Sequence, residues 1–548
     1  MSALLPENEN TRSRKRASLP LLLAVPLVLF AASCILYLFS GTGSFLDSFF
    51  TRSTTALLLC CLLFATLYQG ARQLLGYGGQ MSAVARTVLA ESMGTRAAPA
   101  FLVVLFIALC ALTIPHQEET PVRYMVQTYL GYAFSITSIF AGMLTLLLSC
   151  KTLSREIEEK LIETLAVKPV SRIRYLAGKW MGLVILNAIM LSVAMTVIYL
   201  FTVHHIGARP GLDAMDSDLI EKEILTAREF LPAQPYPALS RQVELQLEKL
   251  KAEKPGTLYR LGEKEATRRE LGPLDESSIT LLGIEQARKK LARLVPRRWR
   301  SLGPGRSRGF VFEGLGHLRD SKAPLKLRYR IAAPPGGETG PALLSVFTGE
   351  KEELREFNTL EPGYLDIAPG SIDGEGRLIL GLKNPSDAQG TVIFSSTRGL
   401  EVLSSRASFE GNLLRASLAV WIKLSFLSML GLLCSSFLGF PVAVLFCAMI
   451  LLGATTSPFL MDVADMSHNP DNLGGFFEDF ATSTTAFIGK SLGRYSEFKP
   501  GVQLVDGRLF SWTDLGRCFL WIGIVWTGLS GSLAAFAYSR RELARVQV

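Results

Sequence analysis

The stretch 151–172, KTLSREIEEKLIETLAVKPVSR, carries the side chains best placed to bind a partner. It is rich in carboxylates and basic groups, and it lies between two strongly apolar runs. Ile157, Leu161 and Leu165 recur every four residues, so on a helix they form one apolar face. This pattern predicts a helix over 154–168 that docks into a groove of another protein, with the carboxylates fixing its orientation. A solvated loop helix is the alternative.

The two ends of this helix also follow from residue type. Ser154 is suited to be its N-cap, because a serine side chain can accept a hydrogen bond from a free amide of the first turn. Pro169 is expected to end it, because proline lacks an amide hydrogen and clashes with the preceding turn. The sequence therefore predicts a short helix that is bounded on both sides.

Enzymatic residues are scarce in this chain. A phosphate-binding loop requires GxxxxGK[ST], and the nearest match, Thr484–Ser491, has threonine at the first glycine position and no preceding hydrophobic strand. With five histidines and no HExxH or paired-carboxylate motif, we expect no catalytic residue and no cofactor bound by the chain. All eight cysteines fall in apolar runs without CxxC spacing, which predicts packing residues, no metal site and no disulfide framework.

The composition indicates a membrane protein. The chain of 548 residues is 49% hydrophobic and 19% charged, whereas soluble domains carry about 25% charged residues. Runs of about 20 apolar residues are long enough to cross a bilayer as helices. We therefore expect an α-helical polytopic membrane protein of about eight transmembrane helices, at 19–40, 53–70, 99–115, 128–150, 181–203, 415–437, 440–460 and 517–538.

The distribution of basic residues predicts the orientation. The net charge of +9 does not indicate nucleic-acid binding, because much of it flanks the apolar runs at both chain ends. The positive-inside rule then places both termini and the segment 151–179 in the cytoplasm. Residues 31–34, AASC, could instead belong to a cleaved lipoprotein signal, but the apolar run continues past Cys34, so an uncleaved helix is expected.

The remaining segments divide the chain into domains. We expect a transmembrane hairpin at 1–70, a cytoplasmic segment at 71–98, a first core half at 99–203, an extracytoplasmic domain at 204–414, and a second core half at 415–548 with an outer loop at 461–515. Apolar residues at 81–93 predict an amphipathic helix on the inner membrane surface, or else a helix packed on a neighbour. The extracytoplasmic domain should be helical over 213–300 and β-sandwich-like over 309–403, with strands at 309–314, 325–332, 342–348, 377–382 and 390–396.

Three other groups of side chains have a functional and a plain interpretation. Lys423 lies inside the sixth run and is a candidate intramembrane functional residue, or else it extends to the interface. His204 and His205 could bind a metal, but they have no acidic or thiol neighbours and fit an interface better. The basic run 288–300 could contact anionic lipid or a polyanionic envelope polymer, or form a solvated helix face.

The segment SREIEEKLIETLAVKPVSRIRYLAGKWMG resembles the intracellular loop of ABC-2 type transporter permeases. The chain departs from that pattern at Lys160 and Leu161, where the family often has Gly-Thr. The resemblance covers roughly 81–204 and 415–540, and the large insert is similar to that of a subset of the family. The matching positions are Ser154, Arg155, Glu156, Glu163, Thr164, Leu165, Pro169, Val170, Ser171, Arg172 and Lys179.

This resemblance implies a permease subunit of an exporter in the bacterial inner membrane, with a six-helix core preceded by an elbow helix. A separate ATPase subunit would bind ATP and Mg, a second permease subunit would complete the pathway as a homodimer or heterodimer, and 154–168 would be the coupling helix. The insert would meet substrate or an envelope protein or polymer. The alternative is a non-transporting scaffold or sensor. The residues implied to couple the ATPase are Glu156, Ile157, Leu161, Glu163, Thr164, Leu165, Pro169 and Arg172.

Overall fold

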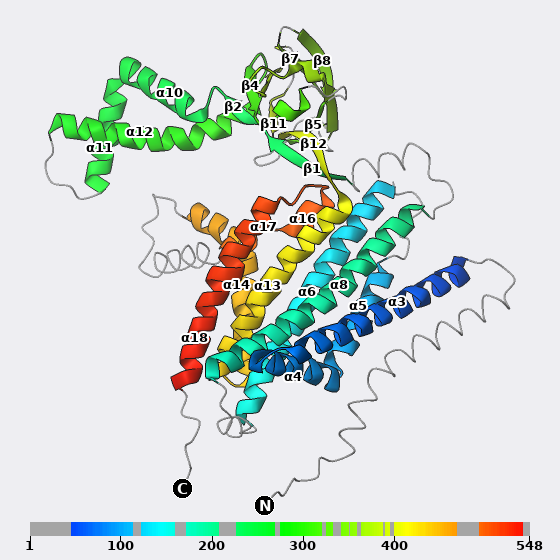
Figure 1. The fold of residues 1–548 in the computed structure, drawn as a ribbon. Coiled ribbons are helices and arrows are strands. Elements are labelled where there is room, and N and C mark those ends of the chain that lie inside the picture. Colours follow the sequence, from blue (N-terminus) through cyan, green and yellow to red (C-terminus); the bar gives the residue numbers. More distant parts are fainter. Residues whose placement is uncertain are drawn as a thin grey trace, which may run out of the picture. The chain divides into compact units, whose positions relative to one another are not determined.

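The computed structural model shows two compact units (Figure 1). The helical unit combines Met1–Ala227 with Ala407–Val548, and the inserted unit is Arg228–Arg406. The structure describes residues 45–112, 122–158, 171–207, 226–268, 275–319, 325–332, 341–349, 351–358, 363–386, 390–394, 399–467 and 493–540. The predicted first run, 19–40, lies outside these residues.

The helical unit is a bundle of long apolar helices. Five of the described helices are long and apolar enough to cross a membrane, and the pair α4 and α5, bent by 60°, would make a sixth. The predicted count of eight is therefore not confirmed. The helices are α3 (Phe45–Leu74), α4 (Gln80–Gly94), α5 (Ala97–Ala111), α6 (Val122–Glu158), α8 (Arg172–Gly207), α13 (Phe409–Phe437), α14 (Phe440–Ser467) and the last helix, which runs through α17 (Trp512–Cys518), the π-helix η4 (Phe519–Trp526) and α18 (Thr527–Arg540).

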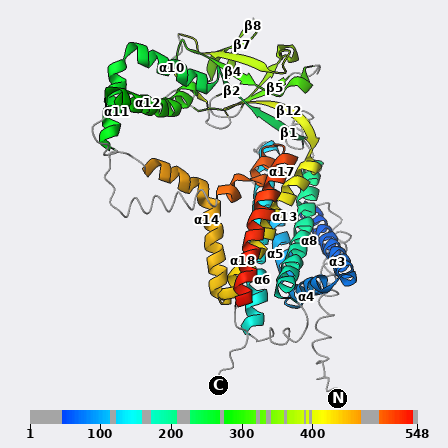
Figure 2. The same ribbon diagram turned by 60° about the vertical axis from the view of Figure 1, so that its left-hand side comes forward.

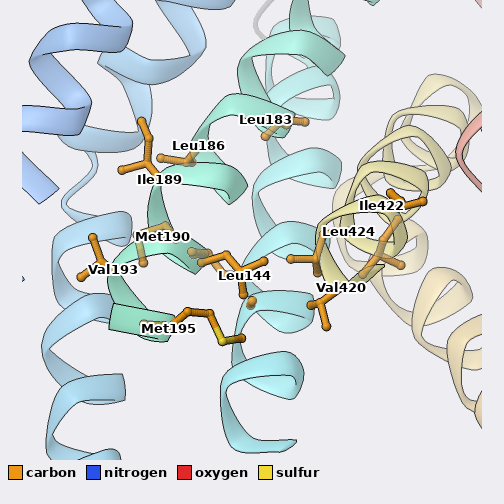
Figure 3. Close-up of a cluster of buried hydrophobic side chains, with 14 of the residues drawn as sticks. Leu144, Leu183, Leu186, Ile189, Met190, Val193, Met195, Val420, Ile422 and Leu424 are labelled. Carbon is orange, nitrogen blue, oxygen red and sulfur yellow. The ribbon is translucent and has the colours of Figure 1, made fainter. Parts of the chain in front are cut away.

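The core of the bundle lies among α6, α8 and α13 (Figure 3). The most apolar window of α8 and that of α13 are each 67% buried, against 22% for the last helix, so α8 and α13 are central and the last helix is peripheral. Leu144 of α6, Leu186 of α8 and Leu424 of α13 belong to the buried cluster that joins them. The central helices are apolar on nearly all sides, as expected of helices surrounded by other helices.

Helix α4 packs on the beginning of α8 through two glycines. A Cβ on Gly178 would lie 2.8 Å from the carbonyl oxygen of Met81, and one on Gly182 would lie 2.8 Å from that of Ala85. The apolar stripe predicted at 81–93 supplies the buried residues of α4, Val88 among them. Part of the stripe therefore packs on a neighbouring helix, and the position of α4 on the inner membrane surface stays a prediction.

The inserted unit begins with two short strands, continues with three helices and is strand-rich afterwards. Its helices are α10 (Leu239–Glu253), α11 (Pro255–Arg268) and α12 (Glu276–Trp299), and α11 and α12 cross at Gly262 and Gly283, where no Cβ would fit. The strands are β1 (Thr226–Pro232), β2 (Gln234–Tyr236), β3 (Ser301–Leu302), β4 (Ser307–Phe312), β5 (Leu325–Tyr329), β6 (Ile331–Ala332), β7 (Ala342–Thr348), β8 (Lys351–Phe357), β9 (Gly363–Ile367), β10 (Leu378–Lys383), β11 (Val392–Phe394) and β12 (Leu400–Ser408).

These strands form three sheets, in the orders β1-β12-β5-β9, β2-β4-β10-β7-β8 and β3-β11-β6, around one shared core (Figure 2). Phe310 of β4 pairs with Leu380 of β10 in antiparallel register, and both side chains are buried. The five strands predicted between 309 and 396 coincide with β4, β5 and β6, β7, β10 and β11. A β-sandwich as such stays a prediction.

The expectation of helix over 213–300 is wrong for 226–236, which forms β1 and β2. Pro232, Pro235 and Pro237 follow one another closely there, and each lacks the amide hydrogen that a helix interior requires. Both strands lie at sheet edges, where proline is tolerated because one side of the strand donates no ladder hydrogen bonds. The predicted amphipathic stretch at 476–488 lies outside the described residues.

Candidate functional site

Glu156 joins the two helices that flank the segment 159–170. Its Oε1 accepts a hydrogen bond from Lys179 Nζ at 2.6 Å, and its Oε2 accepts one from the Tyr175 hydroxyl at 2.6 Å. Glu156 lies near the end of α6, whereas Tyr175 and Lys179 lie one turn apart on the same face of α8. Both carboxylate oxygens are therefore used to connect α6 with α8.

This ion pair is largely withdrawn from solvent. The Lys179 side chain is 2% exposed and that of Glu156 is 17% exposed. The Lys179 ammonium also lies 5.4 Å from the centroid of the Tyr175 ring, within the range of a cation–π contact. Removing one partner of a buried ion pair is strongly destabilising, so we expect both Glu156 and Lys179 to be needed to hold α6 to α8.

Arg172 extends this connection to the last helix. Its Nη1 donates hydrogen bonds to the carbonyl oxygens of Tyr538 at 3.1 Å and Ser539 at 2.8 Å. These carbonyls lie in the last turn of α18, where a helix has no further amides to bond them and favours a cation. We call Glu156, Arg172, Tyr175 and Lys179 the Glu156 junction.

Three of the eight predicted coupling residues are among the residues that the structure describes. Glu156 and Arg172 lie in the junction, and Ile157 packs against the core of the bundle. The others, at 161, 163, 164, 165 and 169, lie outside the described residues. The predicted N-cap at Ser154 is wrong, because α6 continues through it to Glu158 and the Ser154 side chain is buried inside the bundle. Its hydroxyl has no hydrogen-bond partner among the described residues.

Residues 55–216 match the family model described as ABC-2 family transporter protein. This part of the chain is similar to ABC-2 family transporter proteins. The match confirms the predicted resemblance over 81–204 and does not reach its second part, 415–540. It extends from within α3 to α8 and includes all four residues of the Glu156 junction. Comparison with curated proteins and with solved structures finds no match.

Helices α6, α8 and α13 share a polar centre that the sequence analysis missed. Asn187 of α8 accepts a hydrogen bond from the Thr145 hydroxyl of α6 at 2.9 Å and donates one to the Ser428 hydroxyl of α13 at 3.2 Å. All three side chains are buried. The indole of Trp421 also donates to the backbone of α8, at the Val184 carbonyl, at 3.0 Å. Polar links of this kind hold helices together where apolar packing alone gives little specificity.

Lys423 lies on α13 far from the Glu156 junction in sequence. Its Nζ donates a hydrogen bond to the carbonyl oxygen of Phe498 at 2.5 Å and lies 4.6 Å from the centroid of the Tyr495 ring. The lysine thus fastens the segment before α16 (Pro500–Val505) to α13. Closer to the beginning of α13, Asn412 binds the carbonyl of Arg508 and the amide of Phe510, both at 2.8 Å, and so fastens the segment after α16.

Among the described residues no group of three or more His, Cys, Asp and Glu side chains could hold a metal ion. His204 and His205 are part of the last turns of α8. Thr484–Ser491, the nearest approach to a phosphate-binding loop, lies outside the described residues.

The sequence held a signal for three residues that the sequence analysis did not single out, namely Gly178, Gly182 and Tyr175. Gly178 and Gly182 form a small-xxx-small pattern, which typically marks close helix packing in membranes. Tyr175 and Lys179 are four residues apart and so share one face of a helix, and both follow Glu156 of the preceding helix. Nothing local in the sequence distinguishes Asn187 from an ordinary buried amide, because its partners lie 42 and 241 residues away.

Proposed function

We propose that this chain is the membrane-spanning permease subunit of an ATP-driven ABC-2 type exporter in the bacterial inner membrane. The observation that carries the proposal is the ABC-2 family match over 55–216, which includes the Glu156 junction at both ends of the segment 159–170. The chain would not hydrolyse ATP itself. ATP and Mg would bind a separate ATPase subunit, and the transported substrate is unidentified.

The junction suggests how movement would be passed on. The coupling helix predicted at 154–168, of which 154–158 form the end of α6, would contact the ATPase through residues that include Leu161, Glu163 and Leu165. Because Glu156 binds both Tyr175 and Lys179, a displacement of the segment 159–170 would move the ends of α6 and α8 together. Arg172 would carry the same displacement to the end of α18.

The rest of the assembly follows from the same proposal. Both termini would be cytoplasmic, and a second permease subunit, identical or related, would complete the translocation pathway. The inserted unit would lie outside the cytoplasm and receive substrate, bind an envelope protein or polymer, or gate the outer end. Lys423 would hold the segment before α16 in place during the cycle.

The first prediction tests the ATPase contact. Replacing Leu161 and Leu165 by aspartate would place two charges on the apolar docking face, which should abolish co-purification of the ATPase and ATP-driven transport. The measurement is the amount of ATPase retained on the tagged permease, together with ATP hydrolysis of the complex in nanodiscs. Val502→Asp is the control, because Val502 is 47% exposed on α16 and lies far along the chain from the segment 159–170.

Two results would distinguish the alternatives. Loss of the ATPase from the double variant but not from Val502→Asp supports the permease assignment. If the wild-type chain retains no ATPase under any condition, or if the double variant stays fully active, the proposal fails. A non-transporting scaffold or sensor, with the inserted unit as its working part, would then be the better assignment.

A further inference from the structure

The last helix, drawn in red in Figure 1, changes its winding at η4. This segment is a π-helix, in which an amide bonds the carbonyl five residues back instead of four. The Thr527 amide donates to the Ile522 carbonyl in this way, and the Thr527 hydroxyl donates to the same carbonyl at 2.8 Å. The segment Ile522–Thr527, which we call the π-turn, therefore holds one residue more than an α-helical turn.

The extra residue keeps one side of the last helix turned toward the bundle. On an α-helix, the residues of one side recur every three or four positions. The buried side chains are Cys518, Ile522, Thr527, Ser530, Ala534 and Tyr538. Only the step from Ile522 to Thr527 spans five positions, so the π-turn aligns the buried side of α17 with that of α18.

The two halves of the last helix are fastened at their far ends. At the start, Ser511 caps α17, and the Phe510 amide just before it donates to Asn412 of α13 at 2.8 Å. At the other end, Arg172 of α8 binds two carbonyls in the last turn of α18. A displacement of Arg172 would therefore pull on α18, while the contact with Asn412 holds the start of α17.

Between these ends, the packing of α18 offers little resistance to movement. A Cβ on Gly531 would lie 3.3 Å from the terminal methyl group of Met429 of α13, and the buried neighbours Ser530 and Ala534 are also small. A Cβ on Gly528 would meet nothing within 4 Å. The most apolar window of the last helix is only 22% buried, so α18 can move without displacing several other helices.

We propose that the π-turn is a hinge at which α18 tilts relative to α17. Sharp bends in helices concentrate at π-bulges, because the regular ladder of hydrogen bonds is interrupted there. Trp521 lies 5.5 Å from the Arg494 guanidinium, whereas Trp526 packs edge-on against Phe426 of α13 with ring centroids 5.6 Å apart. Trp526 is the last residue before α18, so a tilt of α18 changes its contact with Phe426. This inference rests on the helical unit alone and does not require that the chain transports anything.

The test follows Trp526 in the full-length chain in detergent micelles. The six tryptophans are replaced by 5-fluorotryptophan, Trp526 is assigned with Trp526→Phe, and fluorine relaxation dispersion detects exchange on the microsecond-to-millisecond timescale. Trp526 should show dispersion. Trp180 and Trp421 should show none, because their indoles donate hydrogen bonds that join α8 and α13, both at 3.0 Å.

Deletion of Ile524 removes the extra residue. Ile524 is 52% exposed, and its loss places Ile522 and Thr527 four residues apart, as a regular α-helix requires. The shortened chain should fold with an unchanged or higher thermal midpoint and lose the dispersion at Trp526. Deletion of Ile139, a 68% exposed isoleucine of α6, is the matched control. It should lower the midpoint sharply, because it rotates the residues beyond it by about 100°.

A second variant shifts the same exchange in the opposite direction. Thr527→Val keeps the shape of the side chain but removes its hydrogen bond to the Ile522 carbonyl, so the dispersion at Trp526 should increase. Thr202→Val in α8 is the control, because this buried threonine bonds the Ile198 carbonyl four residues back, and it should change nothing. The proposal is wrong if Trp526 shows no dispersion in the wild type, if the dispersion survives deletion of Ile524, or if that deletion unfolds the chain as deletion of Ile139 does.

Discussion

At the scale of single residues, the helical unit accommodates two lysines in different ways. Lys179 is 2% exposed and has a carboxylate at 2.6 Å, so its charge is neutralised within the bundle. Lys423 has a backbone carbonyl and an aromatic ring, which solvate a cation without neutralising it. The first arrangement makes a fixed joint between two helices, whereas the second fastens a connecting segment. We therefore expect substitutions at the two lysines to have different consequences.

The second prediction concerns the Glu156–Lys179 pair. Glu156→Gln leaves the buried Lys179 ammonium without its counter-charge and should destabilise the helical unit by about 3–5 kcal/mol. The double variant Glu156→Gln with Lys179→Met removes both charges and should recover to within about 2 kcal/mol of the wild type, because no buried charge is left unpaired. Reversible unfolding in mixed detergent micelles measures each free energy.

An exposed ion pair provides the comparison. Glu285 and Lys289 of α12 are 49% and 57% exposed and their charged atoms lie 2.6 Å apart. Glu285→Gln with Lys289→Met should change stability by less than about 1 kcal/mol, since water screens the pair. If Glu156→Gln is as mild as this control, the Glu156 junction does not hold α6 to α8.

At the scale of elements, the beginning of α8 is held by three neighbouring helices. Within three turns it meets α4 through Gly178 and Gly182, α6 through Tyr175 and Lys179, and α18 through Arg172. A rigid helix held at one end by three neighbours is suited to transmit a displacement, because none of the contacts can shift alone. This constraint is independent of which substrate the assembly moves.

The third prediction tests the contact between α4 and α8. Gly182→Ala would place a methyl group 2.8 Å from the Ala85 carbonyl oxygen, and backbone must move to relieve it. Such overpacking should cost about 1–3 kcal/mol and lower the thermal midpoint of the purified chain. Gly70→Ala on α3 is the control, because a Cβ there meets nothing within 4 Å and alanine favours the helix. Equal midpoints for the two variants would show that α4 is not tightly packed.

At the scale of the whole molecule, the sequence predicted elements well and contacts poorly. Apolar runs and alternating strands depend on local spacing, which is why α6, α13, β4 and β7 fall where they were expected. The N-cap at Ser154 failed because a capping residue looks the same when a long helix simply continues through it. The partners of Glu156 and Asn187 come from distant segments, so only the folded chain brings them together.

The inserted unit provides the last prediction. Its first strand, β1, and its last, β12, are neighbours in one sheet, and the Ala233 amide just after β1 donates to the Leu400 carbonyl at 3.0 Å. The two connections to the helical unit therefore leave close together, so a short linker can join them at a small loop-closure cost. Replacing 228–406 by a short Gly/Ser linker should leave a monodisperse, membrane-inserted helical unit that still retains the ATPase. Export should be lost if the insert receives substrate or gates the outer end. Aggregation of the shortened chain, with the full-length chain behaving well in parallel, would instead mean that the helical unit cannot fold without the insert.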